Sequence, residues 1–166
     1  MILYSQRLRY ERVTESGLDD FHRLVQDDHV RRYLMDGQVL PREWSVERIR
    51  ESETLFLRSG VGIWLAYARD TCELTGFCGF LELLSVHAEP QLVYALLERF
   101  TGAGYATEMA RTSIAEARRH AGLDTIVARV DEATAASVRV LEKLGFRAAA
   151  TQPGSFGPVL VMVLEK

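Results

Sequence analysis

Two glycines, at positions 102 and 104, stand where an apolar run ends and a helical pattern begins. Apolar residues recur at helical spacing after them, from Ala106 to Ala117. The first N–H groups of a helix have no partner inside the helix, and the helix dipole makes that end positive. Because glycine lets the backbone approach an oxyanion closely, this pattern predicts a phosphate or pyrophosphate site at the start of the helix.

A plain strand-to-helix turn would contain the same two glycines, so the neighbouring residues must be considered. A dinucleotide-binding fingerprint requires a third glycine where Thr107 stands, and an acidic residue at the end of the next strand. Asp124 begins that strand instead. A Walker A loop requires Gly-Lys followed by Ser or Thr, which the sequence lacks. The glycine turn therefore fits neither motif.

Two segments in order resemble one known family. Thr101-Gly102-Ala103-Gly104-Tyr105-Ala106-Thr107-Glu108 resembles the acetyl-CoA loop of the GNAT superfamily, in the form G-x-G-Y-A-T-E of the ribosomal-protein N-acetyltransferase branch. Residues 133–146, which read ATAASVRVLEKLGF, resemble the second motif of that branch, N-x-x-S-x-x-V-L-E-K-L-G-F. Leu8-Arg9-Tyr10 and the strand around Trp64 also fit, so the resemblance covers nearly the whole chain.

The resemblance implies an α/β (α+β) fold whose mixed, mostly antiparallel sheet is flanked by helices and splayed between its fourth and fifth strands. The pantetheine arm of acetyl-CoA would lie in that cleft. The implied cofactor-binding residues are Tyr94, Ala95 and Leu96 for the arm, and Gly102, Ala103, Gly104, Tyr105 and Ala106 for the pyrophosphate.

The implied activity is direct acetyl transfer, in a ternary complex, from acetyl-CoA to a primary amine of a small molecule or a protein N-terminus. A non-catalytic acyl-CoA-binding or regulatory domain of the same fold is the alternative. A structural domain that binds no cofactor is a third interpretation.

The sequence departs from the family pattern at four positions. Thr101 replaces the usual Gln, Arg or aromatic residue, and Arg99 could either restore a charge or lie on the surface. Thr134 replaces an Asn and fits both a cofactor contact and a simple helix N-cap. Gln91 replaces a glutamate that often serves as base, and Leu141, which is typical of a core position, replaces a tyrosine that often serves as acid.

Ser137 and Glu82 are the catalytic candidates that remain. Ser137 matches the serine of the second motif, contacts the cofactor in this interpretation, and could donate a hydrogen bond to the leaving sulfur. It could equally be a small residue that allows close helix packing. Glu82 interrupts an apolar run and could line the cleft or face solvent. His87 and Glu89, in the following loop, could touch an acceptor or provide only loop polarity.

The elements that must position these residues are indicated by hydrophobic periodicity. The expected strands cover residues 8–13, 63–68, 74–84, 91–97 and 125–130, a segment that begins at 146, and 159–164. The strand at 125–130 lacks polar alternation and is therefore expected to be buried on both faces. The expected helices cover residues 18–25, 30–34, 41–57, 106–121 and 135–144.

Length and composition predict one globular domain over residues 1–166, with a formal net charge of -3 that favours neither nucleic acid nor an anionic membrane. Cys72 and Cys78 form no C-x-x-C pair, which indicates reduced thiols and a cytoplasmic location. We expect no metal site, no membrane span, and a monomer or homodimer. Acceptor selectivity is expected to come from the first helices and the loop at residues 85–90.

Overall fold

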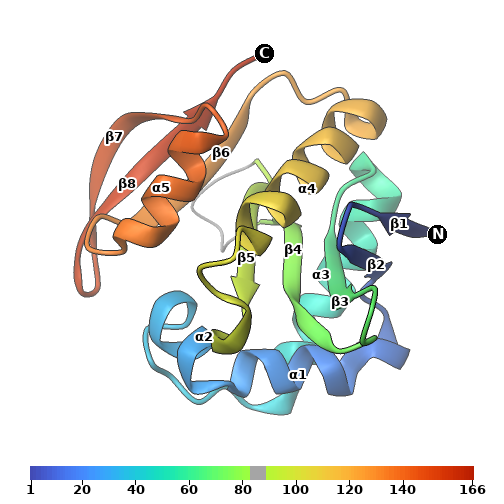
Figure 1. Cartoon of the computed structure of the whole chain (residues 1–166). Coiled ribbons are helices and arrows are strands. Elements are labelled where there is room, and N and C mark those ends of the chain that lie inside the picture. The colour runs from blue at the N-terminus through green and yellow to red at the C-terminus, as the bar shows by residue number, and fades with distance from the viewer. Residues whose placement is uncertain (83–88) are drawn as a thin grey trace.

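The computed structural model describes residues 1–82 and 89–166, which form eight strands and five α-helices (Figure 1). In chain order these are β1 (Ile2–Tyr4), β2 (Leu8–Arg12), α1 (Leu18–Gln26), α2 (Asp28–Leu34), α3 (Arg42–Ser59), β3 (Ile63–Ala68), β4 (Leu74–Leu81), β5 (Gln91–Leu96), α4 (Tyr105–Ala121), β6 (Ile126–Asp131), α5 (Ala135–Lys143), β7 (Arg147–Gly154) and β8 (Gly157–Leu164). Two short 3₁₀ helices, η1 (Glu15–Gly17) and η2 (Glu98–Phe100), precede α1 and the glycine loop.

The described strands form one sheet in the order β1-β2-β3-β4-β5-β6-β8-β7. Neighbouring strands are antiparallel except β5 and β6, which run parallel and pair only at Gln91 and Val127. Beyond that pair the two strands separate, and the sheet opens toward their carboxyl ends (Figure 1). Because the three-residue β1 was not predicted, β5 and β6 are the fourth and fifth predicted strands. The expected fold and its splay are therefore confirmed.

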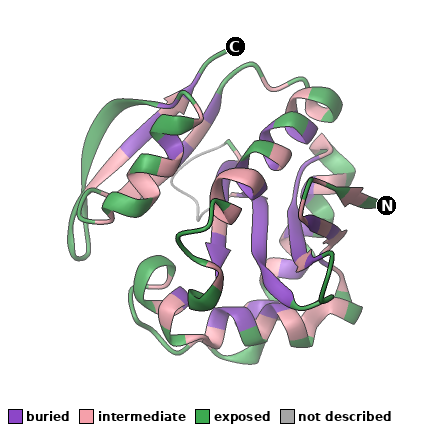
Figure 2. Cartoon of the chain, viewed as in Figure 1, coloured by how far each residue is buried: buried purple, intermediate pink, exposed green. Residues whose placement is uncertain are grey.

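Helices cover both faces of the sheet. Under α4 and α5 lie two clusters of buried apolar side chains, one centred on Trp64 and Met109 and the other on Ile126 and Leu141. A third cluster, which includes Phe77, fills the space between the sheet and α1, α2 and α3. Every residue of β4 is buried, because this central strand is covered on both faces (Figure 2). Both faces of the sheet are thus packed as far as β5, the strand at which the sheet opens.

Most predicted elements are found within a few residues of their expected bounds, and three differences have physical causes. The strand at 125–130 is not buried on both faces: in β6, Ile126 and Ala128 are buried, while the residues between and after them are partly exposed. β1 was missed because three residues are too few to show a period. β7 is exposed along its whole length, because it forms the sheet edge and pairs only with β8. Its residues therefore show little hydrophobic pattern.

Candidate active site

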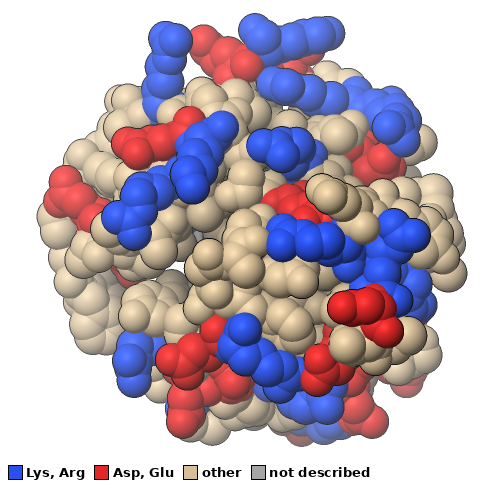
Figure 3. All heavy atoms as spheres, in the orientation of Figure 1, with Lys and Arg blue, Asp and Glu red and all other residues tan. Residues whose placement is uncertain are grey.

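The glycine loop leads directly into α4 and exposes backbone rather than charged side chains. Gly102 and Gly104 have φ values of 77° and 83°, in the left-handed region that favours glycine. Gly104 is the N-cap of α4, and no side chain in the described part of the chain accepts a hydrogen bond from the first N–H groups there. Figure 3 shows the molecule from the same side as Figure 1. Acidic and basic side chains are interspersed on this surface around an area that has no charged side chains. The loop therefore offers backbone N–H groups at the positive end of a helix dipole.

β5 bonds β4 through alternate residues and directs the others toward the opening. The Leu97 N–H donates to the Thr75 carbonyl at 3.0 Å, and the Ala95 oxygen lies 2.0 Å from the place of a Cβ on Gly76. Hydrogen-bonding groups alternate along an antiparallel strand, so the backbone groups of Tyr94 and Leu96 face β6. β6 does not pair with them. Of the three predicted arm-binding residues, Tyr94 and Leu96 thus present backbone groups to the opening, and Ala95 presents its backbone to β4.

The start of α5 lies across the opening from β5. Thr134 occupies the N-cap, yet its side chain makes no capping hydrogen bond. Its hydroxyl is therefore not used in the way that a simple N-cap would use it. Three residues later the Ser137 carbonyl accepts a hydrogen bond from the Tyr94 hydroxyl at 3.2 Å. This bond brings the predicted residues of β5 and α5 together.

The Tyr94 side chain is a feature that sequence reasoning missed, since only its backbone was expected to act. Burial raises the pKa of the Tyr94 hydroxyl to about 12. The hydroxyl therefore remains protonated near neutral pH and serves as a donor. It links β5 to the first turn of α5.

A second missed feature is an ion pair behind the glycine loop. The Arg7 guanidinium donates from Nε to Glu108 at 2.8 Å and from Nη1 to the Ala103 carbonyl, also at 2.8 Å. Glu108 belongs to the first sequence motif, and that position is the one signal that could have identified it. Arg7 lies about a hundred residues earlier and carried no such signal.

The catalytic candidate Glu82 directly follows β4, and its polar contacts are with α3 rather than with the glycine loop or α5. Its carboxylate forms an ion pair with Arg58 of α3, and its backbone N–H donates to Glu51 at 2.8 Å. Burial raises the pKa of Glu51 above its ordinary value. Glu82 is therefore directed toward α3. His87 and the loop at 85–88 lie outside the described residues.

Other residues at or near the positions where the sequence departs from the family pattern lie in the core, at the opening of the sheet and on the surface. Leu141 is buried in the core beneath α5, as expected. Gln91 is 1% exposed, and neither atom of its amide has a hydrogen-bond partner within the described part of the chain. It stands at the single β5–β6 pair, where the sheet begins to open. Arg99 pairs with Glu73 at 3.3 Å and stacks on Phe100, so its charge is directed away from the loop.

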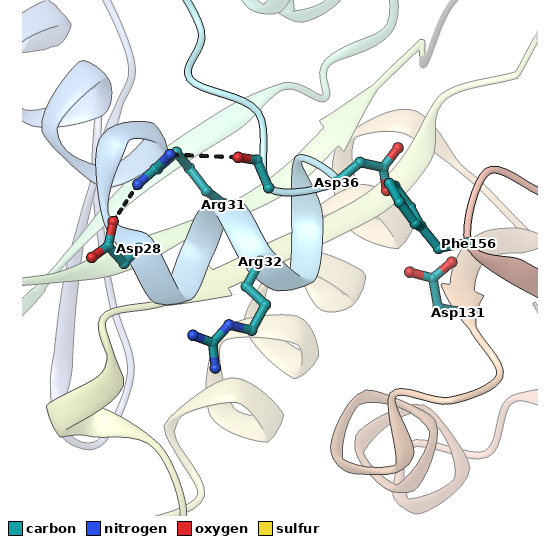
Figure 4. Close-up of a pocket in the computed structure, with 7 residues that line it drawn as sticks. Asp28, Arg31, Arg32, Asp36, Asp131 and Phe156 are labelled. Carbon is teal, nitrogen blue, oxygen red and sulfur yellow. Dashed lines mark hydrogen bonds and ion pairs between the residues drawn. The ribbon is translucent and has the colours of Figure 1, made fainter.

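A pocket of about 400 Å³ lies between α2 and the far half of the sheet. Its walls come from α2, the turn that follows it, the end of β6 and the tip of the β7–β8 hairpin; they are Asp28, Arg31, Arg32, Asp36, Gly37, Asp131 and Phe156. Arg31 pairs with Asp28 and donates to the Gly37 carbonyl at 3.4 Å. Figure 4 shows the Phe156 ring between the carboxylates of Asp36 and Asp131. This end of the pocket is acidic and aromatic.

No group of three or more His, Cys, Asp or Glu side chains in residues 1–82 and 89–166 is placed to hold a metal ion. No helix in those ranges is long and apolar enough to cross a membrane. Both cysteines are free thiols, Cys72 on the surface and Cys78 in the core.

The comparisons with known proteins agree on one family. Residues 7–147 match the family model described as Acetyltransferase (GNAT) domain. The uncharacterized N-acetyltransferase YoaA of Bacillus subtilis is 27% identical over 146 residues, which cover 88% of this chain and 82% of that protein.

Solved structures show the same fold. A GnaT-family acetyltransferase from Bordetella pertussis superposes with a TM-score of 0.86 at 20% identity and covers 98% of both chains. RimL, a ribosomal L7/L12 alpha-N-protein acetyltransferase in complex with coenzyme A, superposes with a TM-score of 0.82 at 18% identity, covering 99% of this chain and 98% of RimL.

The chain belongs to the GNAT acetyltransferase family, because the family model matches most of its length. The family prediction from the two sequence motifs is confirmed, and the protein is an acetyl-transferring enzyme.

Proposed function

We propose that the protein transfers an acetyl group from acetyl-CoA to a primary amine, directly and within a ternary complex, and that residues 1–166 act as one domain. The observation that carries this proposal is the opening between β5 and β6. Along it lie the first turn of α5 and the backbone edge of Tyr94 and Leu96, which pairs with no strand in residues 1–82 or 89–166. The uncapped start of α4 follows β5 through the short 3₁₀ helix η2. An extended ligand fits this arrangement if it has amide groups that pair with the backbone of β5 and a pyrophosphate that binds the N–H groups at the start of α4.

The residues of the site fit the donor in three parts. The N–H groups from Gly102 to Ala106 would hold the pyrophosphate at the helix end, where neither glycine offers a side chain to crowd it. The backbone of Tyr94 and Leu96 would pair with the pantetheine amides. Thr134, whose hydroxyl makes no capping bond, would contact the cofactor from the other wall.

When bound, acetyl-CoA supplies the acyl group in activated thioester form. The chain then has to orient the amine, receive its surplus proton and assist the leaving sulfur. We assign the sulfur contact to the Ser137 hydroxyl and propose Glu82 as a base that acts through water. Because Glu82 pairs with Arg58, a water chain is needed to connect it to the amine.

The acceptor would approach from the face opposite α4 and α5, where the pocket beneath α2 lies. Arg31 and Arg32 also line the pocket, but they lie toward its other end (Figure 4). An amine is cationic until it loses a proton, and the carboxylates of Asp36 and Asp131 would attract it at their own end. The acceptor is a small-molecule amine or a protein N-terminus in this proposal. RimL, which shares the fold, acts on a ribosomal protein.

Two measurements test the function. Coenzyme A at a hundred times its Kd should raise the melting temperature by about 5–10 °C, because it binds only the folded state. Mass spectrometry of products from a panel of peptides and small amines should then reveal an acetylated amine, with release of coenzyme A that depends on the acceptor. A thermal shift without turnover on any amine would indicate a non-catalytic acyl-CoA-binding domain. No thermal shift, confirmed by calorimetry, would overturn the cofactor assignment.

A further inference from the structure

The turn between β1 and β2 is bonded to the first turns of α4 through buried and half-buried polar groups. The Ser5 hydroxyl donates to Glu108 Oε1 at 2.6 Å, and the Arg7 backbone N–H donates to the same oxygen at 2.8 Å. The Tyr10 hydroxyl lies 3.0 Å from Ser5 Oγ. Glu108 therefore accepts from three donors on one short segment, counting Arg7 Nε. This arrangement fixes where α4 begins relative to the sheet.

Arg7 extends this contact from the helix to the glycine loop itself. Its guanidinium stacks over the Tyr105 ring at 4.0 Å and donates from Nη1 to the Ala103 carbonyl at 2.8 Å. Its Nη2 stands 3.5 Å from the place that a Cβ on Gly104 would occupy. One side chain thus contacts Ala103 and Tyr105, the residues on either side of Gly104. A guanidinium is planar and rigid. When it donates hydrogen bonds to two acceptors and stacks on an aromatic ring, it holds all three groups in a defined geometry.

The ion pair is well enough shielded to act as a fixed connection. The Glu108 side chain is 14% exposed and that of Arg7 is 38% exposed. Burial raises the pKa of Glu108, but hydrogen bonds from Ser5 and Arg7 outweigh it, and the net pKa lies below its ordinary value. Glu108 is therefore ionised near neutral pH and keeps Arg7 in place.

From this geometry we propose that Arg7 is a positioning residue for the acetyl-donor loop. It holds the loop at residues 103–105 in the conformation that directs the N–H groups of α4 at the donor, and Glu108 holds Arg7. The loop carries no charged side chain from Thr101 to Thr107, and Arg99 is bonded elsewhere. The guanidinium that braces the loop therefore comes from a different segment of the chain. This inference rests on the proposed function, in which that loop binds acetyl-CoA.

The test compares Arg7→Met with Arg9→Met in the full-length protein. Arg9 is a matched control, because it also forms an ion pair, with Glu11, and stacks on an aromatic ring, Tyr67, but does not touch the loop. If the loop has its binding-competent conformation in only about a tenth of the Arg7→Met molecules, the apparent Kd for coenzyme A rises about tenfold. KM for acetyl-CoA should rise similarly, while kcat and the acceptor KM stay within about twofold, since uniform binding alone is lost. Arg9→Met should change none of these values.

Two further measurements separate positioning from general stability. Arg7→Lys keeps the charge but loses the fork and the stacking, so its Kd should lie between those of the wild type and Arg7→Met. Hydrogen exchange in the protein without coenzyme A should be faster at residues 101–106 in Arg7→Met than in Arg9→Met. Glu108→Gln should reproduce the effect, and the double variant should be no worse than either single variant.

The outcomes distinguish this inference from the proposed function. If the wild type binds no coenzyme A, the proposed function fails, and hydrogen exchange alone decides the role of Arg7. Unchanged exchange at residues 101–106, or a Kd that shifts equally in Arg7→Met and Arg9→Met, would overturn the inference. If Arg7→Met does not fold, Arg7→Lys and Glu108→Gln provide the same comparison.

Discussion

The two sides of the opening in the sheet are built from different kinds of groups. On the proposed donor side, the loop before α4 and the edge of β5 present backbone groups, and side chains such as Arg7 and Tyr94 brace them. On the proposed acceptor side, the pocket beneath α2 is lined by ionisable and aromatic side chains from four separate segments. Recognition by backbone tolerates substitutions such as Thr101, because the groups that bind remain. Recognition by side chains changes with every substitution, so the acceptor side is where selectivity would vary.

The largest effect should follow from blocking the backbone of the donor loop. Gly104→Val should abolish the thermal shift with coenzyme A, because a branched side chain crowds the anion and cannot adopt a φ of 83° without strain. Gly122→Val is a matched control, since Gly122 caps the other end of α4 with a φ of 61° and open space around it. It should destabilise the protein comparably and leave coenzyme A binding intact. Retained binding by Gly104→Val would show that the loop is misassigned.

Ser137→Ala should lower kcat by about ten- to a hundredfold, or roughly 1.4 to 2.7 kcal/mol on the barrier. The reason is the loss of a hydrogen bond to the leaving sulfur, near the positive end of α5. Coenzyme A affinity should change little, because the pyrophosphate site lies on α4. Steady-state kinetics and calorimetry provide both values. A loss below twofold would make Ser137 a packing residue, and a loss of affinity with normal kcat would make it a cofactor contact.

On the acceptor side, smaller effects are expected from single charges. Asp131→Asn should raise KM for cationic amines by about two- to fivefold, the range of a partly exposed ion pair, with the acetyl-CoA KM unchanged. The increase should shrink as salt is added, since exposed charges are screened. Asp124→Asn is the control, because Asp124 pairs with Lys166 and lies outside the pocket. If the two variants change KM equally, the pocket is not part of the acceptor site.

The smallest effect concerns stability and pH. Because the pKa of Glu108 is lowered in the folded state, its contribution is complete above the ordinary pKa of about 4.3 and is lost as the pH falls through the lowered value. Glu108→Gln should therefore lower the melting temperature at pH 7 by about 2–4 °C, for roughly 1 kcal/mol. The difference from the wild type should disappear in acid, below the folded pKa. A difference that stays constant with pH would mean that the carboxylate charge is not what stabilises α4.

Local patterns were sufficient for the fold and the family, and the donor site that they predict stays a prediction. Hydrophobic patterns and the glycines that end helices indicated all five helices and seven of the eight described strands, although for β7 only its start was expected. The two motifs identified the family. The glycine loop could be read directly because left-handed glycines before a helix act through the backbone of contiguous residues. β1 and the burial of β6 could not be read, since three residues show no period and burial depends on which elements pack on each face.

The sequence by itself determined the family, the order of the elements and the glycine loop at the start of α4. These depend on residues that are neighbours in the chain, whose propensities and spacing act locally. Only the tertiary structure decided that Arg7 braces Ala103 and Glu108, that Tyr94 bonds to Ser137, and that Glu82 turns to Arg58. Each of these pairs joins segments far apart in sequence, and their meeting depends on how the strands order in the sheet and how the helices pack on it.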